Sequence, residues 1–364
     1  MSGIDFEKLD QYMQRAQINA ENLRWHDPGE EKNLEISGLY WFQKEKRYHR
    51  FPVDPVPAPN EKIMALAECT AGAQLRFRTD STRIIISSCV TSDAPSRNMG
   101  EPGHSGFDLY MGAPGNEVFW SCTHSVPGEK ENMEAIFAVE TKEMREFRLN
   151  FPLYNGVESF YIALDADAEV LPPTPLAVKS PIVIYGTSIT QGGCASRPGA
   201  AFTNRLSRNL QAEFLNFGFS GNGVNDAETA KIVAQVEDPA LIIMDSEANS
   251  ISKELVNERV PVFLDILRSK HPETPILVMT KVTYGPRYAS IPILKEEFKN
   301  IVLQRQQNGD KHLYFFDGST FWEGETAGEH TVDGAHPSDS GFDLIARKLS
   351  PVLKELLQAY GYLS

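Results

Sequence analysis

The second half of the chain alternates apolar runs with amphipathic stretches, and this alternation restricts the fold more than any other feature. Apolar runs typical of buried strands occupy residues 182–185, 213–217, 240–245, 275–280 and 312–316. Stretches with helical periodicity occupy residues 200–210, 226–235, 253–269, 292–307 and 340–360. Parallel strands covered by helices on both faces produce this pattern. We therefore predict an α/β fold, a three-layer α/β/α domain with a five-stranded parallel sheet.

In the first half of the chain the apolar residues follow a different spacing. Its short segments are rich in β-branched and aromatic residues and are separated by Gly, Pro, Asn and Asp: LYWFQ, AQLRFRT, RIIISSCV, FDLYMG, EVFWSCT, FRLNFPL and SFYIALDAD. This pattern predicts an all-β, jelly-roll-like antiparallel sandwich. Apolar and polar residues alternate in LRFR (75–78) and FRLN (147–150), so we expect one sheet face to pack inward and the other to meet water.

Three prolines at positions 172, 173 and 175 stop both strand and helix and predict the domain boundary. Residues 1–175 then form the sandwich domain, and residues 176–364 form the α/β domain. Phe6, Leu9, Tyr12 and Met13 are spaced as on a short amphipathic helix, which we place at residues 4–17. Residues 91–105 form a polar loop too long for a hairpin turn.

Composition excludes several classes of protein. The 364 residues carry a net charge of -14 and do not concentrate Lys and Arg, which argues against a nucleic-acid partner. No apolar run approaches the ~20 residues of a membrane helix, so no membrane partner is expected. The N-terminus lacks the pattern of a secretory signal, and we expect a cytoplasmic protein. The four cysteines are widely spaced and are expected to be free thiols.

Polar residues follow several of the predicted strands. Ser188 comes after the first strand, Gly221 lies in a glycine-rich segment after the second, and Asn249 follows the third. Asp333 and His336 lie on the loop before the last helix. Chemistry in such sheets collects beyond the carboxyl ends of the strands, so we expect these five residues to lie close together.

These residue types match the needs of acyl transfer. The Ser188 hydroxyl could attack a carbonyl, His336 could take its proton, and Asp333 could orient the imidazole. The N–H groups of Ser188 and Gly221 and the side-chain amide of Asn249 could form an oxyanion hole. Each residue also has a structural alternative, such as a helix cap or a turn. Their joint occurrence at one sheet edge favours the catalytic interpretation.

Four motifs resemble those of the SGNH, or GDSL-like, hydrolase family. They are GTSIT, NFGFSGNG, DSEAN and DGAHP, although Thr187 stands where the family name expects Asp. The resemblance implies Ser188 as nucleophile, Asp333 and His336 as its partners, and Gly221 and Asn249 in the oxyanion hole. GFDLY at residues 106–110 is similar to the GxDLY motif of a β-sandwich that precedes the hydrolase domain in one subgroup.

That subgroup and similar two-domain arrangements include carbohydrate acetyl esterases and an acyltransferase that tailors an aromatic polyketide. The resemblance therefore implies a serine esterase that removes a short acyl group, expected to be acetyl, from a carbohydrate or related polyol. Its partner would be a small-molecule or oligosaccharide ester. Two alternatives stay open: an acyltransferase that passes the acyl group to an acceptor hydroxyl, and a non-catalytic glycan-binding protein.

Arg197 is a candidate substrate-binding residue, because its guanidinium could meet an anionic or sugar group near Ser188. A salt bridge within its own loop is an equal alternative. No cofactor and no metal are predicted, because the eight histidines are dispersed without HxH or HExxH spacing.

Overall fold

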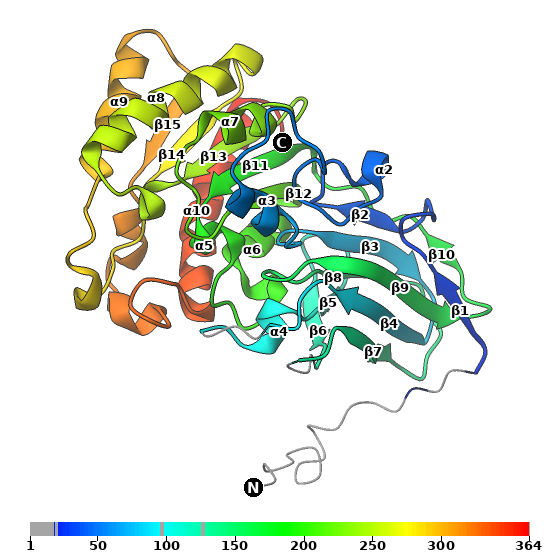
Figure 1. The fold of residues 1–364 in the computed structure, drawn as a ribbon. Coiled ribbons are helices and arrows are strands. Elements are labelled where there is room, and N and C mark those ends of the chain that lie inside the picture. The colour runs from blue at the N-terminus through cyan, green and yellow to red at the C-terminus, as the bar shows by residue number, and fades with distance from the viewer. Residues whose placement is uncertain (1–17, 19–20, 95–97, 125–127, 364) are drawn as a thin grey trace, which may run out of the picture.

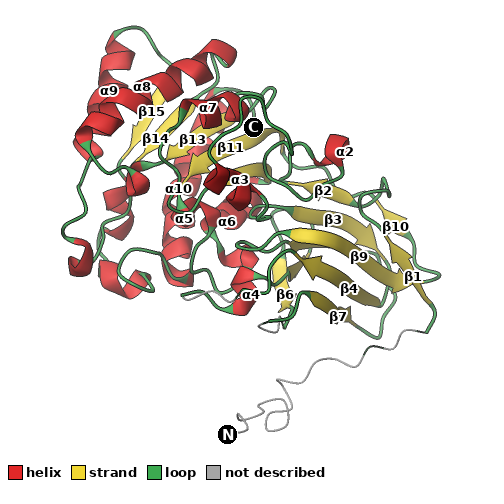
Figure 2. Ribbon diagram, viewed as in Figure 1, coloured by secondary structure: helices red, strands yellow, loops and turns green. Residues whose placement is uncertain are grey.

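A computed structural model of the chain describes residues 18, 21–94, 98–124 and 128–363. The predicted N-terminal helix at residues 4–17 lies outside this range. The described residues form an all-β part and a part that mixes strands and helices, which lie side by side (Figures 1 and 2). In the described part of the chain, no helix is long and apolar enough to cross a membrane.

Two antiparallel sheets make up the first part, as predicted. One has the order β1-β9-β4-β7, with strands at Leu23–His26, Val157–Asp165, Arg83–Val90 and Glu131–Ala138. The other has the order β10-β3-β8-β5-β6, with strands at Val170–Leu171, Gln74–Thr79, Arg145–Asn150, Asp108–Met111 and Val118–Cys122. Strand β2 (Glu35–Ser37) pairs with β3. Short helices α3 (Glu61–Ala67) and α4 (Glu101–His104) lie in the connections.

Alternation along the strands builds the core between these sheets. Leu75 and Phe77 of β3 pair with Leu149 and Phe147 of β8, and all four side chains are buried. The rings of Phe77 and Phe147 stack with centroids 5.5 Å apart. Such cross-strand apolar pairs stabilise the sheet and fix its register.

The expectation that the polar face of this sheet meets water is wrong. Arg76, Arg148 and Asn150 alternate with the core residues, yet their exposed fractions are only 3%, 2% and 0%. The α/β part covers this face: the Arg148 guanidinium donates a hydrogen bond to Ser207 Oγ, 2.8 Å away. The polar side chains therefore serve a hydrogen-bonded interface between the two parts.

The predicted strand LYWFQ is also wrong. Residues 40 and 41 form a turn, and helix α2 (Phe42–Glu45) follows. Leu39 and Phe42 pack into the sandwich core, whereas Trp41 packs into a core of the α/β part. In a strand the side chains of Leu39 and Phe42, three residues apart, would point to opposite faces, whereas the turn places both in the sandwich core.

Five parallel strands form the sheet of the second part, as predicted. Their order is β12-β11-β13-β14-β15, with bounds Ala212–Gly218, Val178–Gly186, Leu241–Asp245, Ile276–Met279 and Leu313–Phe316. Helices α6 (Phe202–Leu210) and α10 (Asp339–Ala359) share one apolar cluster with the sheet. Helices α7 (Ala227–Val233), α8 (Lys253–Lys270) and α9 (Lys295–Gln307) pack in another. Figure 1 shows the helices on both sides of this sheet.

The buried guanidinium of Arg50 joins the two parts. Arg50 is fully buried and donates to the carbonyl oxygens of Cys69 and Leu66 in the first part, at 2.7 and 2.5 Å. It also donates to Asn216 O and Gly218 O at the end of β12, at 3.0 and 2.6 Å. Burial holds the pKa of Arg50 near 10, below its usual value, and the side chain remains a cation at neutral pH.

We predict that Arg50→Met lowers the free energy of unfolding by about 3 kcal/mol, because buried carbonyl oxygens lose their donors. Chemical denaturation would measure the change. Arg347→Met is the matched control, since Arg347 is 64% exposed in its ion pair with Asp343 and its loss should cost less than about 1 kcal/mol. Equal effects of the two substitutions would contradict the structural role given to Arg50.

Candidate active site

Ser188 lies at a sharp turn between β11 and the short helix α5 (Ser188–Gln191). Thr187 caps the helix: its Oγ1 accepts from Ile189 N–H, and its own N–H donates to Thr190 Oγ1, 3.2 Å away. Gly186 is required before the turn, because an added Cβ would lie 2.0 Å from Thr190 Oγ1. Ser188 therefore stands at the first position of a capped helix, where its N–H has no intrahelical acceptor.

The structure brings Ser188, His336 and Asp333 into one hydrogen-bonded chain. Ser188 Oγ lies 2.9 Å from His336 Nε2. His336 Nδ1 lies 2.8 Å from Asp333 Oδ2. This arrangement can remove a proton from the serine hydroxyl and hold the imidazole in the tautomer that does so.

Asp333 is held as a carboxylate by its own loop. Partial burial by itself would raise the pKa of Asp333, but the hydrogen bonds it accepts from the N–H groups of His336 and Ala335 and from the His336 imidazole bring it below its usual value. The two N–H groups lie 2.9 and 3.0 Å from Oδ1. The D-x-x-H spacing thus lets one short loop supply and orient both groups.

Gly221 and Asn249 lie on two loops that are tied to each other. Gly221 has φ +68°, a conformation that favours glycine. Asn249 ends the short helix η3 (Glu247–Asn249), and its Oδ1 accepts from Gly223 N–H at 3.1 Å. The carbonyl end of the amide is thereby occupied, which leaves Nδ2 as the donor that Asn249 can offer. The predicted oxyanion roles of Gly221 and Asn249 remain predictions.

Two residues that sequence analysis missed hold the nucleophile turn in place. Tyr154, from the loop after β8, donates from its hydroxyl to Ser188 O at 3.2 Å. Gln191 Nε2 donates to Leu153 O at 3.1 Å, and Gln191 Oε1 accepts from Ser220 N–H at 3.0 Å. The sandwich therefore contacts the serine turn, and Gln191 links this turn to the Gly221 loop. Nothing local in the sequence marks Tyr154, although Gln191 immediately follows GTSIT.

Arg197 is engaged by the sandwich. Its Nη1 lies 2.8 Å from Asp108 Oδ2 and 2.5 Å from the hydroxyl of Tyr110, both from the GFDLY motif. Its guanidinium also lies over the Phe119 ring, 3.9 Å from the centroid. The alternative of a salt bridge within the loop of Arg197 is therefore wrong, because the salt bridge forms with Asp108, which is distant in sequence. Contact between Arg197 and substrate remains a prediction.

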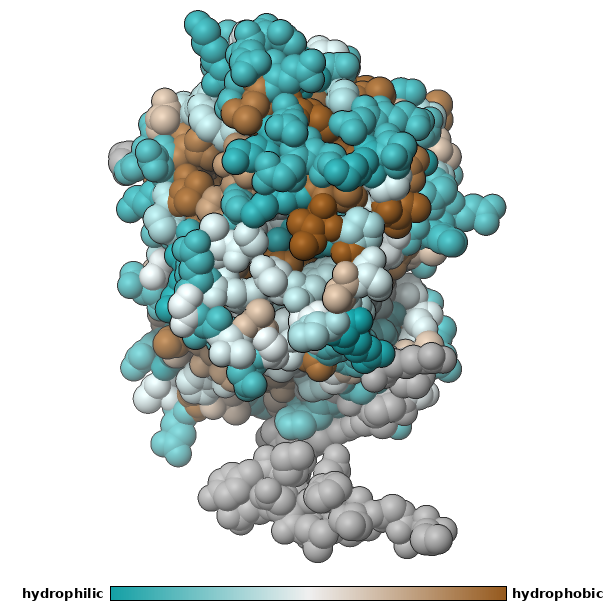
Figure 3. Space-filling model, turned by 90° about the vertical axis from the view of Figure 1, so that its left-hand side faces the viewer, coloured by the Kyte–Doolittle hydropathy of each residue, from teal (hydrophilic) through white to brown (hydrophobic). Residues whose placement is uncertain are grey.

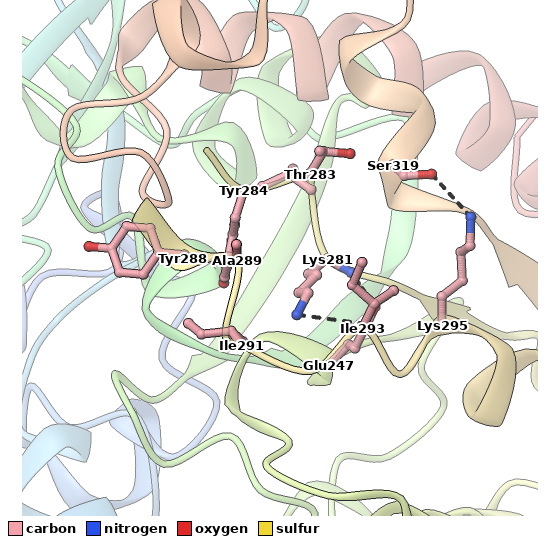
Figure 4. Close-up of a pocket in the computed structure, with 11 residues that line it drawn as sticks. Glu247, Lys281, Thr283, Tyr284, Tyr288, Ala289, Ile291, Ile293, Lys295 and Ser319 are labelled. Carbon is pink, nitrogen blue, oxygen red and sulfur yellow. Dashed lines mark hydrogen bonds and ion pairs between the residues drawn. The ribbon is translucent and has the colours of Figure 1, made fainter. Parts of the chain in front are cut away.

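A cavity of about 180 Å³, drawn in Figure 4, is lined by segments that are connected to the loops of this site. One wall is formed by Tyr284 and Tyr288, and the segment between them is bonded to the catalytic loop through Gly285 N–H and Gly334 O, 2.7 Å apart. Another wall is Glu247, two residues before Asn249. On the molecular face drawn in Figure 3, hydrophobic residues gather near the middle among hydrophilic ones.

The polar groups of the cavity are partly engaged with each other. Glu247 accepts from the N–H groups of Lys281 and Leu294 at 2.9 and 2.8 Å. Lys281 Nζ donates to Pro292 O at 2.6 Å and lies 4.0 Å from Glu247 Oε1. The Lys281 ammonium also lies 5.0 Å from the centroid of the Tyr284 ring. A ligand in the cavity would meet aromatic rings, aliphatic side chains and the ammonium groups of Lys281 and Lys295.

The comparisons with known proteins agree with this architecture. Residues 179–354 match the GDSL-like Lipase/Acylhydrolase family. Residues 23–170 match the family described as N-terminus of Esterase_SGNH_hydro-type, which is named for its GxDLY motif. None of the curated proteins compared with the chain matches it.

Solved structures extend the likeness over nearly the whole chain. A GDSL-like lipase from Bacteroides ovatus is 29% identical, with a TM-score of 0.84, and the match covers 93% of this chain and 98% of the other. The salicylyl-acyltransferase SsfX3 from a tetracycline biosynthetic pathway is 18% identical, with a TM-score of 0.73 and coverages of 94% and 99%. A family two carbohydrate esterase from Clostridium thermocellum is 14% identical, with a TM-score of 0.60 and coverages of 87% and 99%.

The chain is a two-domain acyl hydrolase of the esterase type. It belongs to the SGNH, or GDSL-like, hydrolases and to the subgroup that carries an N-terminal GxDLY sandwich.

A buried carboxyl lies beneath the nucleophile turn and gives the site a pH-dependent stability. Asp245, at the end of β13, accepts from Thr190 Oγ1 at 2.7 Å. Burial raises the pKa of Asp245 to about 7, a rise that the Thr190 hydrogen bond opposes and the charge of Glu247 adds to. The native state therefore keeps a proton on Asp245 at pH values where the unfolded chain has already released it.

We predict that Asp245→Asn gains stability relative to the unsubstituted protein as pH rises. Between the ordinary pKa of 3.8 and about 7, the native protein binds a proton that the unfolded chain does not, so rising pH destabilises it by up to a few kcal/mol. The neutral amide of the variant avoids this loss of stability. Urea denaturation at pH 5 and pH 8 would measure the difference in free energy of unfolding between the two proteins. A difference that does not change with pH would contradict the prediction.

Proposed function

We propose that the enzyme hydrolyses a short acyl ester, foremost an acetyl ester, of a carbohydrate or related polyol through an acyl-enzyme on Ser188. The observation that carries the proposal is the chain of hydrogen bonds from Asp333 through His336 to Ser188, at 2.8 and 2.9 Å. Ser188 lies almost 150 residues before His336 in the sequence, so the fold brings the two together. Such a chain is the recurring device for activating a serine hydroxyl.

The mechanism follows from the positions of these groups. His336 Nε2 takes the proton as Ser188 Oγ attacks the ester carbonyl, and Asp333 stabilises the imidazolium that forms. The Ser188 and Gly221 N–H groups and the Asn249 amide stabilise the oxyanion. The intermediate collapses as His336 gives its proton to the departing alcohol. Water, activated by His336, then releases the acid and restores the serine.

The cavity drawn in Figure 4 supports a polyol as the alcohol. The faces of Tyr284 and Tyr288 suit the apolar face of a sugar ring, and Lys281 can donate to a ring hydroxyl. A carbohydrate esterase among the solved structures has the same fold. The preference for acetyl rests on the family resemblance of the motifs.

We predict that Ser188→Ala lowers hydrolysis of p-nitrophenyl acetate by at least about 10³-fold while the protein stays folded, because the nucleophile is lost. A fluorophosphonate probe should label the unsubstituted enzyme and not the variant. Ser180→Ala is the control, since the Ser180 hydroxyl donates to Asp238 near the start of β11, at the opposite end of the strand from Ser188, and the variant should keep full activity.

Retained esterase activity in Ser188→Ala would refute the mechanism. Absence of both activity and labelling in the unsubstituted protein would favour the non-catalytic glycan-binding alternative.

We predict that Tyr288→Ala raises KM for an acetylated oligosaccharide by about fivefold, because the loss of a ring contact is worth about 1 kcal/mol. The rate with p-nitrophenyl acetate should change little, since that ester carries no sugar. Mass spectrometry would follow loss of acetyl groups from acetylated plant oligosaccharides. Equal effects on both substrates would show that Tyr288 supports the catalytic loop and does not bind the alcohol.

The acyltransferase alternative differs only in what attacks the acyl-enzyme. Its support is the fold shared with the salicylyl-acyltransferase over 94% of this chain. Incubation with an acyl thioester and a polyol acceptor separates the two, because transfer yields a new ester and hydrolysis yields free acid alone.

A further inference from the structure

The thiol of Cys194 lies beside the catalytic Asp and His. Cys194 Sγ, a carboxylate oxygen of Asp333 and a ring nitrogen of His336 all lie within 4.8 Å of one another. In the part of the chain that the structure describes, this is the single group of three or more such side chains close enough to share an ion. Local spacing cannot reveal it, because Cys194 is far from the D-x-x-H loop in sequence.

The turn that positions Ser188 also positions the thiol. Gly193 N–H donates to Ser188 O at 2.8 Å, and Ala195 N–H donates to Gly192 O at 3.1 Å. Between them Cys194 has φ +76°, a conformation that is uncommon for residues other than glycine. Cys194 is 8% exposed. Backbone held in this way is concentrated at functional and ligand-binding sites.

These donors form a zinc-type ligand set. A thiolate, an imidazole and a carboxylate are the three protein ligands that Zn²⁺ prefers, and a site with three of them leaves one position open. Ser188 Oγ lies 2.9 Å from His336 Nε2, so the nucleophile is hydrogen-bonded to one of these three side chains.

We propose that Cys194, Asp333 and His336 bind Zn²⁺ and that this binding reversibly inhibits the hydrolase. The thiol proton is released to solvent as the thiolate coordinates, and no group is oxidised or reduced. A neutral imidazole has one lone pair. Whichever ring nitrogen binds the metal, the other carries the proton, so His336 cannot accept the proton of Ser188. The inhibition therefore rests on the proposed function, whereas the binding does not.

Cobalt binding tests the site without using activity. Titration of the apo protein with Co²⁺ should produce a thiolate-to-cobalt charge-transfer band that saturates at one equivalent and is displaced by Zn²⁺. Cys194→Ala should lack the band. Cys89→Ala is the matched control, because the Cys89 thiol also has a carboxylate nearby, at 3.6 Å from Glu158 Oε2, and should keep the band.

Inhibition is measured with p-nitrophenyl acetate. Zn²⁺ should abolish hydrolysis by the unsubstituted enzyme, and EDTA should restore it. Cys194→Ala should keep its basal rate and need at least about tenfold more Zn²⁺ for half-inhibition, as expected for loss of one ligand. If the Cys194→Ala variant does not fold, the Cys194→Ser variant is used in its place.

Three results separate the outcomes. A missing charge-transfer band, or equal zinc sensitivity in Cys194→Ala, would overturn the site. A band that disappears in Cys89→Ala would also overturn it, because the metal would then lie on the sandwich. An unsubstituted protein that shows the Cys194-dependent band without esterase activity would support the metal site and refute the proposed function.

Discussion

The buried guanidinium of Arg50 is the interaction on which the rest of the structure depends. A cation without a carboxylate partner is costly to bury unless its donors are satisfied, and here main-chain carbonyl oxygens accept from it on both sides of the domain junction. The Phe219 ring lies 4.8 Å from the guanidinium carbon. Since two of the acceptors end β12, directly before the loop of Gly221, the first domain helps to set where that loop begins.

Other contacts across the domain junction also connect the sandwich to the active site. One face of the sandwich sheet is polar and buried, and it meets the hydrolase domain through hydrogen bonds and ion pairs such as Arg197–Asp108. Tyr154 reaches the carbonyl of Ser188 itself. Polar interfaces demand defined geometry, because a misplaced partner leaves a buried group unpaired. The sandwich therefore acts as a rigid support for the active site, and the GxDLY motif is a part of that support.

The sequence predicted what is encoded locally and missed what docking creates. The five parallel strands were predictable because buried strands are apolar throughout, and the D-x-x-H loop because both groups lie within one turn of chain. The turn and helix at residues 39–45 were not predictable. Trp41 and Phe42 are residue types common in strands, and their conformation is set by packing into two separate cores. Tyr154 reaches the site only through contacts between segments distant in sequence. Cys194 lies on the serine turn, but it meets Asp333 and His336 only because the distant D-x-x-H loop packs against that turn.

Thr187 shows why one departure from the family pattern is tolerated. The position before the nucleophile is the N-cap of α5, and its side chain accepts a hydrogen bond from Ile189 N–H. Asp and Thr both perform this capping. Thr190 completes the reciprocal bond and also donates to the buried Asp245. Thr187 is fully buried, and a carboxylate in its place would have to be taken out of water at a turn that already covers the buried carboxyl of Asp245. A neutral cap therefore fits this turn, since a buried acid already lies beneath it.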